Sequence, residues 1–423
     1  MEPKIGKTIF SLRDAVKFIR SFNQPPLDTL HTDDGKVYRE CLLHRLESIK
    51  SCLSELEFIH QSSCFVFTDG KVVTFNGEVF CSVECDLDIE GAVISIPLFR
   101  MLRVLDEHTI TIEQGDEEFL IKGNGRSVGV PLLEQILLPF DSEVDKPKKW
   151  HPLHNDFCKV VKTVAPCAGT DATKRALLCI HCHPDFLEAT DNYQAIRFPL
   201  KTGFKKEILI RAESLKYVAA EGVSEYSETK EWVHFRNATE MVMSCRLLRE
   251  VYPTSDRKFP NNGELVELPS GLKRAADSAD VMAATDDSAH APWTPTVILS
   301  LKQGVLRVMS EGSRGWHKEE LPWKYDGPEM IFTIHASVLQ QIARWTNQCR
   351  ISCKDKRADC IVVDGEIFKY MTQASECKST HVLGVLLESD ERYFRQKCKR
   401  RRGSAAGGGA DELCGILLNC PSK

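Results

Sequence analysis

The sequence of 423 residues has no apolar run approaching the roughly 20 residues that a membrane-spanning helix needs. Its first ten residues, MEPKIGKTIF, lack the apolar core of a secretory signal peptide. Hydrophobic residues make up 42% and charged residues 27% of the chain, which is typical of soluble proteins. We therefore expect a cytoplasmic protein with no membrane partner.

Sequence signatures of catalysis are also scarce. The chain has no Walker-type P-loop for nucleotide phosphates and no H-E-x-x-H motif of metal-dependent proteases. Thr190-Asp191 and Thr68-Asp69 each place a hydroxyl beside a carboxylate, but such pairs are commoner in turns than in nucleophilic sites. The sequence therefore predicts a protein that is not an enzyme and needs no cofactor.

The seventeen cysteines are scattered along the chain, which favours reduced thiols packed as small apolar residues in strands. One cluster invites a metal interpretation, because alternation along a strand places Cys179, His181 and His183 on one side. A fourth ligand would have to come from elsewhere in the chain. Strand packing is the favoured interpretation and no metal site is predicted. A zinc-dependent nucleic-acid enzyme stays open as an alternative.

The clearest structural unit lies at residues 176–200. An apolar run meets a turn at His183-Pro184-Asp185, resumes, and turns again before a third apolar stretch, which predicts short antiparallel strands. A further strand then enters a helix in which Leu215, Val218 and Ala219 share one face. Two more strands, at 232–236 and 241–248, complete the unit.

The same order of elements occurs before and after this unit. Its helices begin near Pro97, Ala212 and Ala336, a spacing of roughly 115 to 125 residues that fits repeated domains. Each copy also opens with a helix, expected from Leu42 and at 154–166 and 268–282. We predict an α+β chain with an N-terminal extension (1–41), three similar domains (42–147, 148–260 and 261–375) and a flexible basic, Gly-rich tail (376–423). A short helix at 12–22 is expected in the extension.

Lysine or arginine lies beside the apolar face of each expected helix. If the helices of the three domains share one surface, these residues form a basic stripe that attracts the phosphate backbone of DNA without reading its sequence. The net charge of −5 does not exclude this, because it says nothing about where charges lie. The alternative is simple exposure to water. The residues are Arg45, Lys50, Arg100, Arg103, Lys159, Lys162, Lys216, Lys273, Arg274 and Arg344.

The order of elements, the triplication and several motifs together resemble the bacterial-type DNA polymerase III beta sliding clamp, in a divergent bacterial or phage-encoded form. Residues 188–191, Glu-Ala-Thr-Asp, resemble the A-T-D-G turn of the family's middle domain. Arg246-Leu247-Leu248 with Tyr252-Pro253 resembles its K-L-[IV]…F-P-[DN]-Y segment. Residues 319–327 are similar to an E-E-x-[IL]…Y-x-G segment of the third domain.

The resemblance implies three clamp-fold domains, each with antiparallel sheets and two helices. Two chains would join head to tail into a ring whose helices face duplex DNA. Such a processivity factor tethers a replicative polymerase to DNA without catalysing a reaction. A clamp-fold scaffold that binds partners without encircling DNA is the alternative.

The resemblance also implies a cleft between the second and third domains that binds short peptides of the polymerase and the clamp loader. The family's G-H-R-L is replaced here by residues 192–195, Asn-Tyr-Gln-Ala, and its terminal M-P-M-R-L by residues 371–375, Met-Thr-Gln-Ala-Ser. Ordinary turn and strand roles for these residues stay open. The matching positions are Ala176, Thr190, Asn192, Tyr193, Gln194, Ala195, Pro253, Arg257, Lys258, Met371, Thr372, Gln373 and Ala374.

Overall fold

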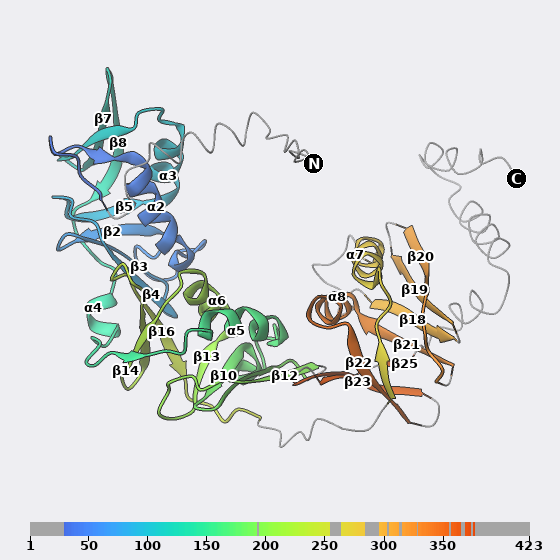
Figure 1. The fold of residues 1–423 in the computed structure, drawn as a ribbon. Helices are drawn as coiled ribbons and strands as arrows, with labels where there is room; N and C mark the ends of the chain where they lie inside the picture. The colour runs from blue at the N-terminus through green and yellow to red at the C-terminus, as the bar shows by residue number, and fades with distance from the viewer. Residues whose placement is uncertain are drawn as a thin grey trace, which may run out of the picture. The chain divides into compact units, whose positions relative to one another are not determined.

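The computed structural model describes residues 29–192, 194–253, 264–283, 296–302, 304–312, 315–327, 329–354, 357–364, 369–373 and 375–376. The helix expected at 12–22 and the predicted tail (376–423), apart from Glu376, lie outside these residues. The chain divides into two compact units (Figure 1). Unit 1 comprises Met1–Phe259 and Asp364–Met371, and unit 2 comprises Pro260–Val363 and Thr372–Lys423.

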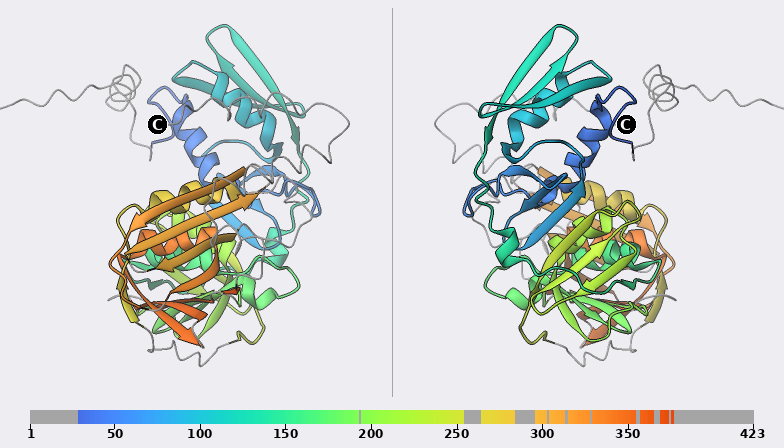
Figure 2. Two further views of the ribbon diagram at one scale, coloured as in Figure 1. Left: turned by 90° about the vertical axis from the view of Figure 1, so that its right-hand side faces the viewer. Right: turned by 90° about the vertical axis from the view of Figure 1, so that its left-hand side faces the viewer.

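The first repeat of unit 1 starts with a short strand and a helix and continues through an antiparallel sheet. Strand β2 pairs with both β3 and β5, and β8 pairs with β7 and, at its end, with β5. The hairpin of β7 and β8 is drawn in teal in Figure 2. The elements are β1 (Val37–Tyr38), α2 (Arg39–Ile49), η1 (Lys50–Cys52), β2 (Cys64–Thr68), β3 (Lys71–Phe75), β4 (Val79–Glu84), β5 (Gly91–Ile94), α3 (Ser95–Val104), β6 (Thr109–Gly115), β7 (Glu118–Gly123) and β8 (Arg126–Leu133).

The second repeat, also in unit 1, has the same order. Strand β10 pairs with β11 and β13, and β16 pairs with β15 and, at its end, with β13. Its elements are β9 (His151–Pro152), α5 (Phe157–Val164), η2 (Ala165–Cys167), η3 (Arg175–Leu178), β10 (Cys179–His183), β11 (Phe186–Thr190), β12 (Gln194–Pro199), β13 (Ile208–Arg211), α6 (Ala212–Ala220), β14 (Glu225–Glu228), β15 (Trp232–Arg236) and β16 (Val242–Leu248).

Unit 2 contains most of the third repeat. Strand β18 pairs with β19 and β21, and β25 also pairs with β21. The pairing of β25 with β21 corresponds to that of β8 with β5 in the first repeat and of β16 with β13 in the second. The elements are β17 (Glu264–Glu267), α7 (Leu272–Ala283), β18 (Thr296–Lys302), β19 (Val305–Gly312), β20 (Gly315–Pro322), β21 (Met330–His335), α8 (Ala336–Trp345), β22 (Gln348–Lys354), β23 (Arg357–Asp364), β24 (Lys369–Gln373) and β25 (Ser375–Glu376).

The three repeats therefore share one topology, and the predicted α+β fold with antiparallel sheets and paired helices is confirmed. In each repeat the two helices pack against one another, α2 on α3, α5 on α6 and α7 on α8. The apolar face expected on α5 is buried, with Phe157, Val160, Val161 and Val164 at most 1% exposed. Burying such a face is what stabilises so short a helix.

Two local expectations differ from the structure. The spacing of the apolar residues Leu42, Leu46, Ile49, Leu53 and Leu56 predicts a helix with one apolar face through Leu56. Helix α2 instead stops at Ile49, and Leu56 is 67% exposed. The chain leaves the helix after η1, where Leu53 has an extended backbone, and the next residue, Ser54, donates its backbone N–H to the carbonyl of Ser62. Residues 139–149 are polar and contain two prolines, which predicts a link without secondary structure. They include a helical turn, α4 (Phe140–Glu143), and the Phe140 ring stacks on Phe80 with the ring centres 5.7 Å apart.

The two repeats of unit 1 are joined strand to strand. Strand β16 continues the sheet of the first repeat by pairing with β4, from Val242 opposite Ser82 to Cys245 opposite Val79. Trp232 lies within the core of the first repeat, and its Nε1 donates to the carbonyl of Glu143 at 2.8 Å. Edge pairing satisfies backbone groups that an open edge would leave to water.

Arg246 closes the same junction. Its Nε donates to the Gly77 carbonyl at 2.7 Å and its Nη2 donates to the Glu143 carboxylate at 2.7 Å. The guanidinium lies 4.7 Å from the centre of the Trp232 ring, in a cation–π contact. One side chain therefore binds the β3–β4 turn, α4 and Trp232 together.

Replacing Trp232 by alanine tests the contribution of this junction. Because Trp232 is fully buried, Trp232→Ala should lower the free energy of unfolding by about 3 to 5 kcal/mol, measured by urea denaturation. Phe58 is 89% exposed, so the matched Phe58→Ala should change it by less than about 0.5 kcal/mol. Equal effects of the two substitutions would contradict this assignment.

A histidine is buried near the same junction. His234 of β15 is inaccessible to solvent, and its Nδ1 lies 2.7 Å from the Ser244 hydroxyl of β16. Burial lowers the pKa of His234 from 6.5 to about 4, against a weaker opposing effect of Asp145. The fold therefore holds this imidazole neutral.

This burial predicts a pH dependence of stability. Above pH 6.5 His234 is neutral in both states, and its contribution is complete. Between pH 6.5 and about 4 only the unfolded chain takes up the proton, so stability should fall by up to about 1.4 kcal/mol per pH unit. In His234→Asn this part of the slope should vanish. Urea midpoints of both proteins from pH 7.5 to 4 measure it, and parallel curves would contradict the prediction.

Candidate nucleic-acid interface and partner cleft

The predicted basic residues lie where they were expected, on the paired helices. All are inside a helix except Lys50, which begins η1 directly after α2. Arg100, Lys159, Lys162, Lys273 and Arg344 are exposed, as is Lys50. The structure thus places these cations on helix surfaces, and their role in binding DNA stays a prediction.

Three of the helices contain basic residues and no acidic ones. These are α3 with Arg100 and Arg103, α5 with Lys159 and Lys162, and α8 with Arg344. On α5 both lysines are exposed while the opposite face is buried. No carboxylate within these helices therefore neutralises the cations.

Other predicted cations have acidic partners. Arg103 donates to Glu47 of α2 at 2.6 Å, and Lys216 pairs with Glu213 one turn earlier at 2.9 Å. Arg274 pairs with Glu319. Because ion pairs on exposed side chains contribute little stability, a DNA phosphate can replace these carboxylates at small cost.

Arg45 differs from the others because it is half-buried and contacts the backbone. Its Nη1 donates to the Glu84 carbonyl at 2.6 Å, which ties α2 to the end of β4. Sequence patterns could not reveal this, because the two residues come from different elements. Part of the donor capacity of Arg45 therefore serves the fold.

Charge reversal on α5 tests the interface. Each phosphate contact adds about 0.9 to the slope of log K against log salt, so Lys159→Glu with Lys162→Glu should lower DNA affinity and reduce that slope by about 2. Anisotropy of a labelled duplex between 50 and 200 mM salt measures both. The matched control is Lys201→Glu with Lys230→Glu, two exposed lysines outside the helices. Equal losses in the two double variants would contradict the assignment.

The predicted partner cleft begins at the β11–β12 turn. Thr190 is fully buried and its hydroxyl donates to the Gln194 carbonyl at 2.6 Å. Gln194 donates through its backbone and side-chain nitrogens to the Asp191 carboxylate at 2.8 and 3.0 Å. Asn192 has φ of 81°, a conformation that asparagine tolerates. These polar groups close the turn. The sequence predicted the turn but not its internal hydrogen bonds.

A residue outside the predicted set adjoins this turn. Tyr370, which belongs to unit 1, is fully buried, and its hydroxyl donates to Gln194 Oε1 at 2.9 Å. Its distance along the chain, 176 positions, explains why sequence reasoning missed it. Gln194 is therefore held by a long-range contact as well as by its own turn.

The other predicted cleft positions are only partly placed. Ala176 lies in η3 and is half-buried, Ala195 is buried, and Pro253 is exposed. Met371, Thr372 and Gln373 belong to β24. Tyr193, Arg257, Lys258 and Ala374 lie outside the described residues. The cleft as a binding site stays a prediction.

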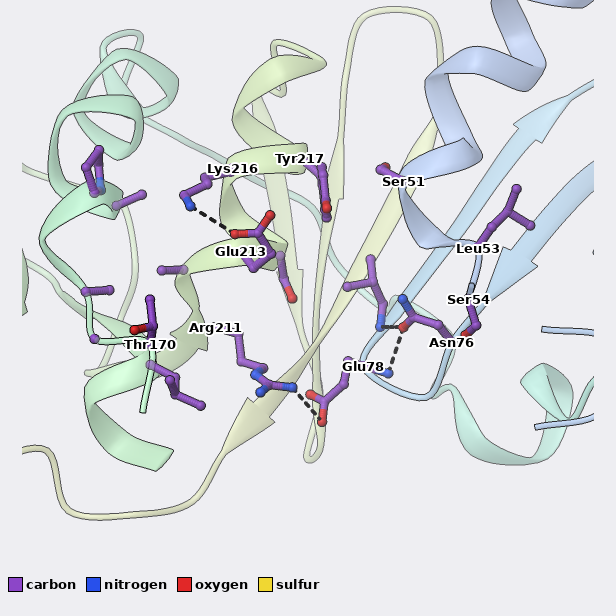
Figure 3. A pocket seen from close by; sticks show the side chains of 18 of the residues that line it. Ser51, Leu53, Ser54, Asn76, Glu78, Thr170, Arg211, Glu213, Lys216 and Tyr217 are labelled. Carbon is purple, nitrogen blue, oxygen red and sulfur yellow. Dashed lines mark hydrogen bonds and ion pairs between the residues drawn. The ribbon is translucent and has the colours of Figure 1, made fainter. Parts of the chain in front are cut away.

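A pair of cavities lies at the junction of the two repeats in unit 1. The larger has a volume of about 660 Å³ and is lined by η1 and the residues just after it, the β3–β4 turn and the start of α6 (Figure 3). In this cavity Nη1 of Arg211 lies 3.4 Å from Oε1 of Glu78, which makes an ion pair. The smaller, of about 210 Å³, shares Glu78, Leu178 and Arg211 with it. Sequence analysis gave no sign of either.

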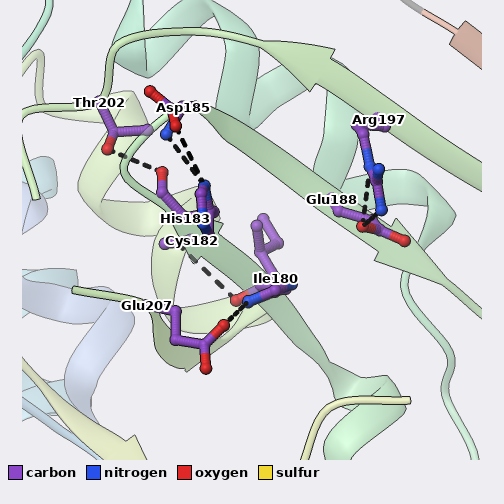
Figure 4. Close-up of polar contacts among 9 residues, drawn as sticks. Ile180, Cys182, His183, Asp185, Glu188, Arg197, Thr202 and Glu207 are labelled. Carbon is purple, nitrogen blue, oxygen red and sulfur yellow. Dashed lines mark hydrogen bonds and ion pairs between the residues drawn. The ribbon is translucent and has the colours of Figure 1, made fainter. Parts of the chain in front are cut away.

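The histidines of β10 pack against neighbouring side chains and make the polar contacts drawn in Figure 4. His181 is 2% exposed, with Nε2 3.2 Å from the Glu207 carboxylate, and the His183 ring stacks on Phe186 at 4.3 Å. Burial lowers the pKa of His181, and Glu207 opposes that shift. Burial also raises the pKa of Cys179 to about 12, which keeps it a thiol. Among the described residues, no group of three or more His, Cys, Asp or Glu side chains could hold a metal ion.

One catalytic pattern escaped the sequence analysis. Residues 125–129, Gly-Arg-Ser-Val-Gly, match the G-x-S-x-G motif of serine hydrolases. That motif needs a sharp turn between a strand and a helix, whereas here Ser127 lies within β8, opposite Lys122 of an antiparallel hairpin. The match therefore has none of the context that would make Ser127 a nucleophile. Within the described part of the chain, no helix is long and apolar enough to cross a membrane.

Comparison with known proteins identifies the fold. No family model matches the chain, and no curated protein matches it. Solved DNA polymerase sliding clamps do match: that of Pseudomonas aeruginosa at TM-score 0.62 and 14% identity, covering 81% of this chain and 99% of the clamp. Those of Bacillus subtilis and Bartonella birtlesii match at TM-score 0.63 and 14% identity, each covering 81% and 98%. The predicted sliding-clamp fold is confirmed.

Proposed function

We propose that this chain, which has the sliding-clamp fold, is a DNA sliding clamp that encircles duplex DNA and tethers a replicative polymerase. The observation that carries the proposal is the strand-to-strand junction between β4 and β16. Repeats that join in this way leave one edge of the first repeat and one edge of the last for another copy. Joining both edges of two chains head to tail gives a closed ring of six repeats.

The repeat also predicts which residues meet between copies. Strand β8 pairs with β5 in the first repeat as β16 pairs with β13 in the second. Strands β8 and β16 are therefore equivalent, and Leu132 corresponds to Leu247. Strand β20 pairs with β19 in the third repeat as β4 pairs with β3 in the first. Strands β20 and β4 are therefore equivalent, and Pro322 corresponds to Glu84. Applying the β4–β16 register then pairs Ser127, Val128, Gly129 and Val130 of one copy with Glu320, Glu319, Lys318 and His317 of the other.

The distribution of exposed apolar side chains supports closure through the outer repeats. In the described part of the second repeat, which has a neighbour on either side along the chain, Val251 is the large hydrophobic residue that is exposed. The first and third repeats expose several more, among them Ile96, Val104, Val281 and Trp316. Exposed apolar surface of this kind is typical of interaction sites.

The basic helices supply the contact to DNA. Lysines and arginines on α3, α5 and α8, without acidic residues in the same helices, attract phosphates in a sequence-independent way. A ring that holds DNA by topology needs no catalytic group, no cofactor and no metal. Partner polymerases and a clamp loader would bind as short peptides at the β11–β12 turn, in the cytoplasm.

The experiment is retention on nicked circular DNA after the clamp loader of the same cell has acted. A ring should stay on circles and leave within seconds when a restriction enzyme linearises them, and light scattering should give twice the chain mass. Equal retention on circles and on linear DNA, or a monomer at all concentrations, would refute the proposal.

Ser127 offers a matched pair of variants, because it is exposed and faces Glu320 of the second copy in the predicted register. Ser127→Asp places like charges opposite one another and should weaken dimerisation, whereas Ser127→Lys should strengthen it. Each cross-strand pair is worth about 0.2 to 1 kcal/mol, and the ring contains two. Sedimentation should show a several-fold shift of the dimer dissociation constant in opposite directions. Identical constants would contradict this register.

A partner-binding scaffold that does not encircle DNA is the second candidate. The pairing of Arg103, Lys216 and Arg274 with carboxylates favours it, because these cations are partly neutralised within the chain. A scaffold would bind partner peptides normally and show no preference for circular DNA. The retention experiment therefore separates the two functions.

A further inference from the structure

The two cavities at the first junction combine charged and apolar groups within unit 1. The smaller cavity is lined by three arginines, three leucines, one carboxylate and one alanine. The leucines are each partly exposed, so apolar surface remains open there. The residues are Arg175, Arg211, Arg246, Leu178, Leu247, Leu248, Glu78 and Ala172.

The arginines are not equally committed to the fold. Arg246 binds the Gly77 carbonyl and the Glu143 carboxylate at 2.7 Å each, so it is a fixed wall of the cavity. Arg211 and Arg175 make longer ion pairs, 3.4 Å to Glu78 and 3.5 Å to Glu250. Their side chains are 42% and 65% exposed. Long, exposed pairs contribute little, and an incoming carboxylate can replace them.

The larger cavity extends this site along the junction. Ser51, Ser54 and Thr170 supply hydroxyl groups, and Lys216 with Glu213 forms a further ion pair on its wall (Figure 3). The side-chain oxygen of Asn76 accepts the backbone N–H groups of Glu78 and Val79 at 3.0 and 2.8 Å. The three hydroxyl groups and the side-chain NH2 group of Asn76 are of the kind that hydrogen-bonds a peptide main chain.

We propose that this junction is a second peptide site, which binds a short segment with a carboxylate next to an aliphatic side chain. The carboxylate takes the place of Glu78 on Arg211 and extends toward Arg175, and the aliphatic side chain packs on Leu178, Leu247 and Leu248. A nucleic-acid backbone would satisfy the arginines but offers nothing to the leucines, which favours a peptide. None of the residues that line the smaller cavity belongs to the β11–β12 turn, and the site does not require a closed ring.

The test is the fluorescence anisotropy of a fluorescein-labelled heptapeptide of alternating Asp and Leu, titrated with the full chain at low salt. Charge-assisted hydrogen bonds are the strong ones, so Arg211→Ala and Arg175→Ala should each weaken binding about tenfold. Glu78→Gln removes the competing carboxylate and should strengthen binding several-fold. The control is Lys201→Ala, a fully exposed cation away from the junction, which should leave binding unchanged.

Three outcomes would overturn the proposal. Equal affinity for a heptapeptide of alternating Asp and Ser would show that the leucines do not take part. Full displacement of the probe by inorganic phosphate or by a short DNA duplex at equal concentration would show a general anion site. Loss of binding in Gln194→Ala, with Arg211→Ala unaffected, would place the probe at the β11–β12 turn.

Retention on circular DNA, measured with the same variants, keeps this proposal distinct from the clamp function. Arg175 and Glu78 lie outside the paired helices, so Arg175→Ala and Glu78→Gln should leave retention unchanged. Weaker peptide binding in Arg175→Ala and stronger peptide binding in Glu78→Gln, each with normal retention, support a separate site. Normal retention without any peptide binding in the unaltered chain overturns this inference alone.

Discussion

The pairing of β16 with the free edge of β4 is the interaction on which the arrangement of unit 1 depends. An antiparallel sheet must either cover its edges or pair them, since unpaired backbone groups attract other strands. Here the edge of the first repeat is paired by the second repeat, and the seam is then fixed by Trp232 and Arg246. The same chemistry that builds each sheet thus also connects one repeat to the next.

This arrangement divides the work between two kinds of element. Strand pairing joins the two repeats of unit 1, so the side chains of these strands must suit packing and register. Helices are free to carry charge, and α3, α5 and α8 do so without acidic residues. A chain with a net charge of −5 can therefore present cationic helices, because the acids are concentrated elsewhere.

The sequence predicted the repeat, the antiparallel strands and the paired helices because these follow from local alternation of apolar and polar residues. It did not predict features that depend on distant partners. Trp232 in the core of the first repeat, Arg45 on the Glu84 carbonyl and Tyr370 on Gln194 each join residues far apart in the chain. Local patterns also misplaced the end of the first helix, because the chain becomes extended at Leu53 and Ser54 then bonds to Ser62.

The candidate site shows the same limit. Sequence patterns located the cations on helices but could not show that Arg103, Lys216 and Arg274 have carboxylate partners. They located the turn at residues 190–194 but not the internal hydrogen bonds that occupy Thr190 and Gln194. Burial and pairing are properties of the folded chain, and no window of neighbouring residues contains them.

The contacts of Trp232 and Arg246 limit how far the angle between the first two repeats can vary. In the proposed ring of six repeats each junction would turn the chain by about 60°, and angular errors of the same sign would add around the circle. A junction that flexed by a few degrees would leave the last edge too far from the first to form strand hydrogen bonds. In the proposed ring, the tryptophan, the arginine and the α4 turn that fix this junction would set how accurately two copies can close.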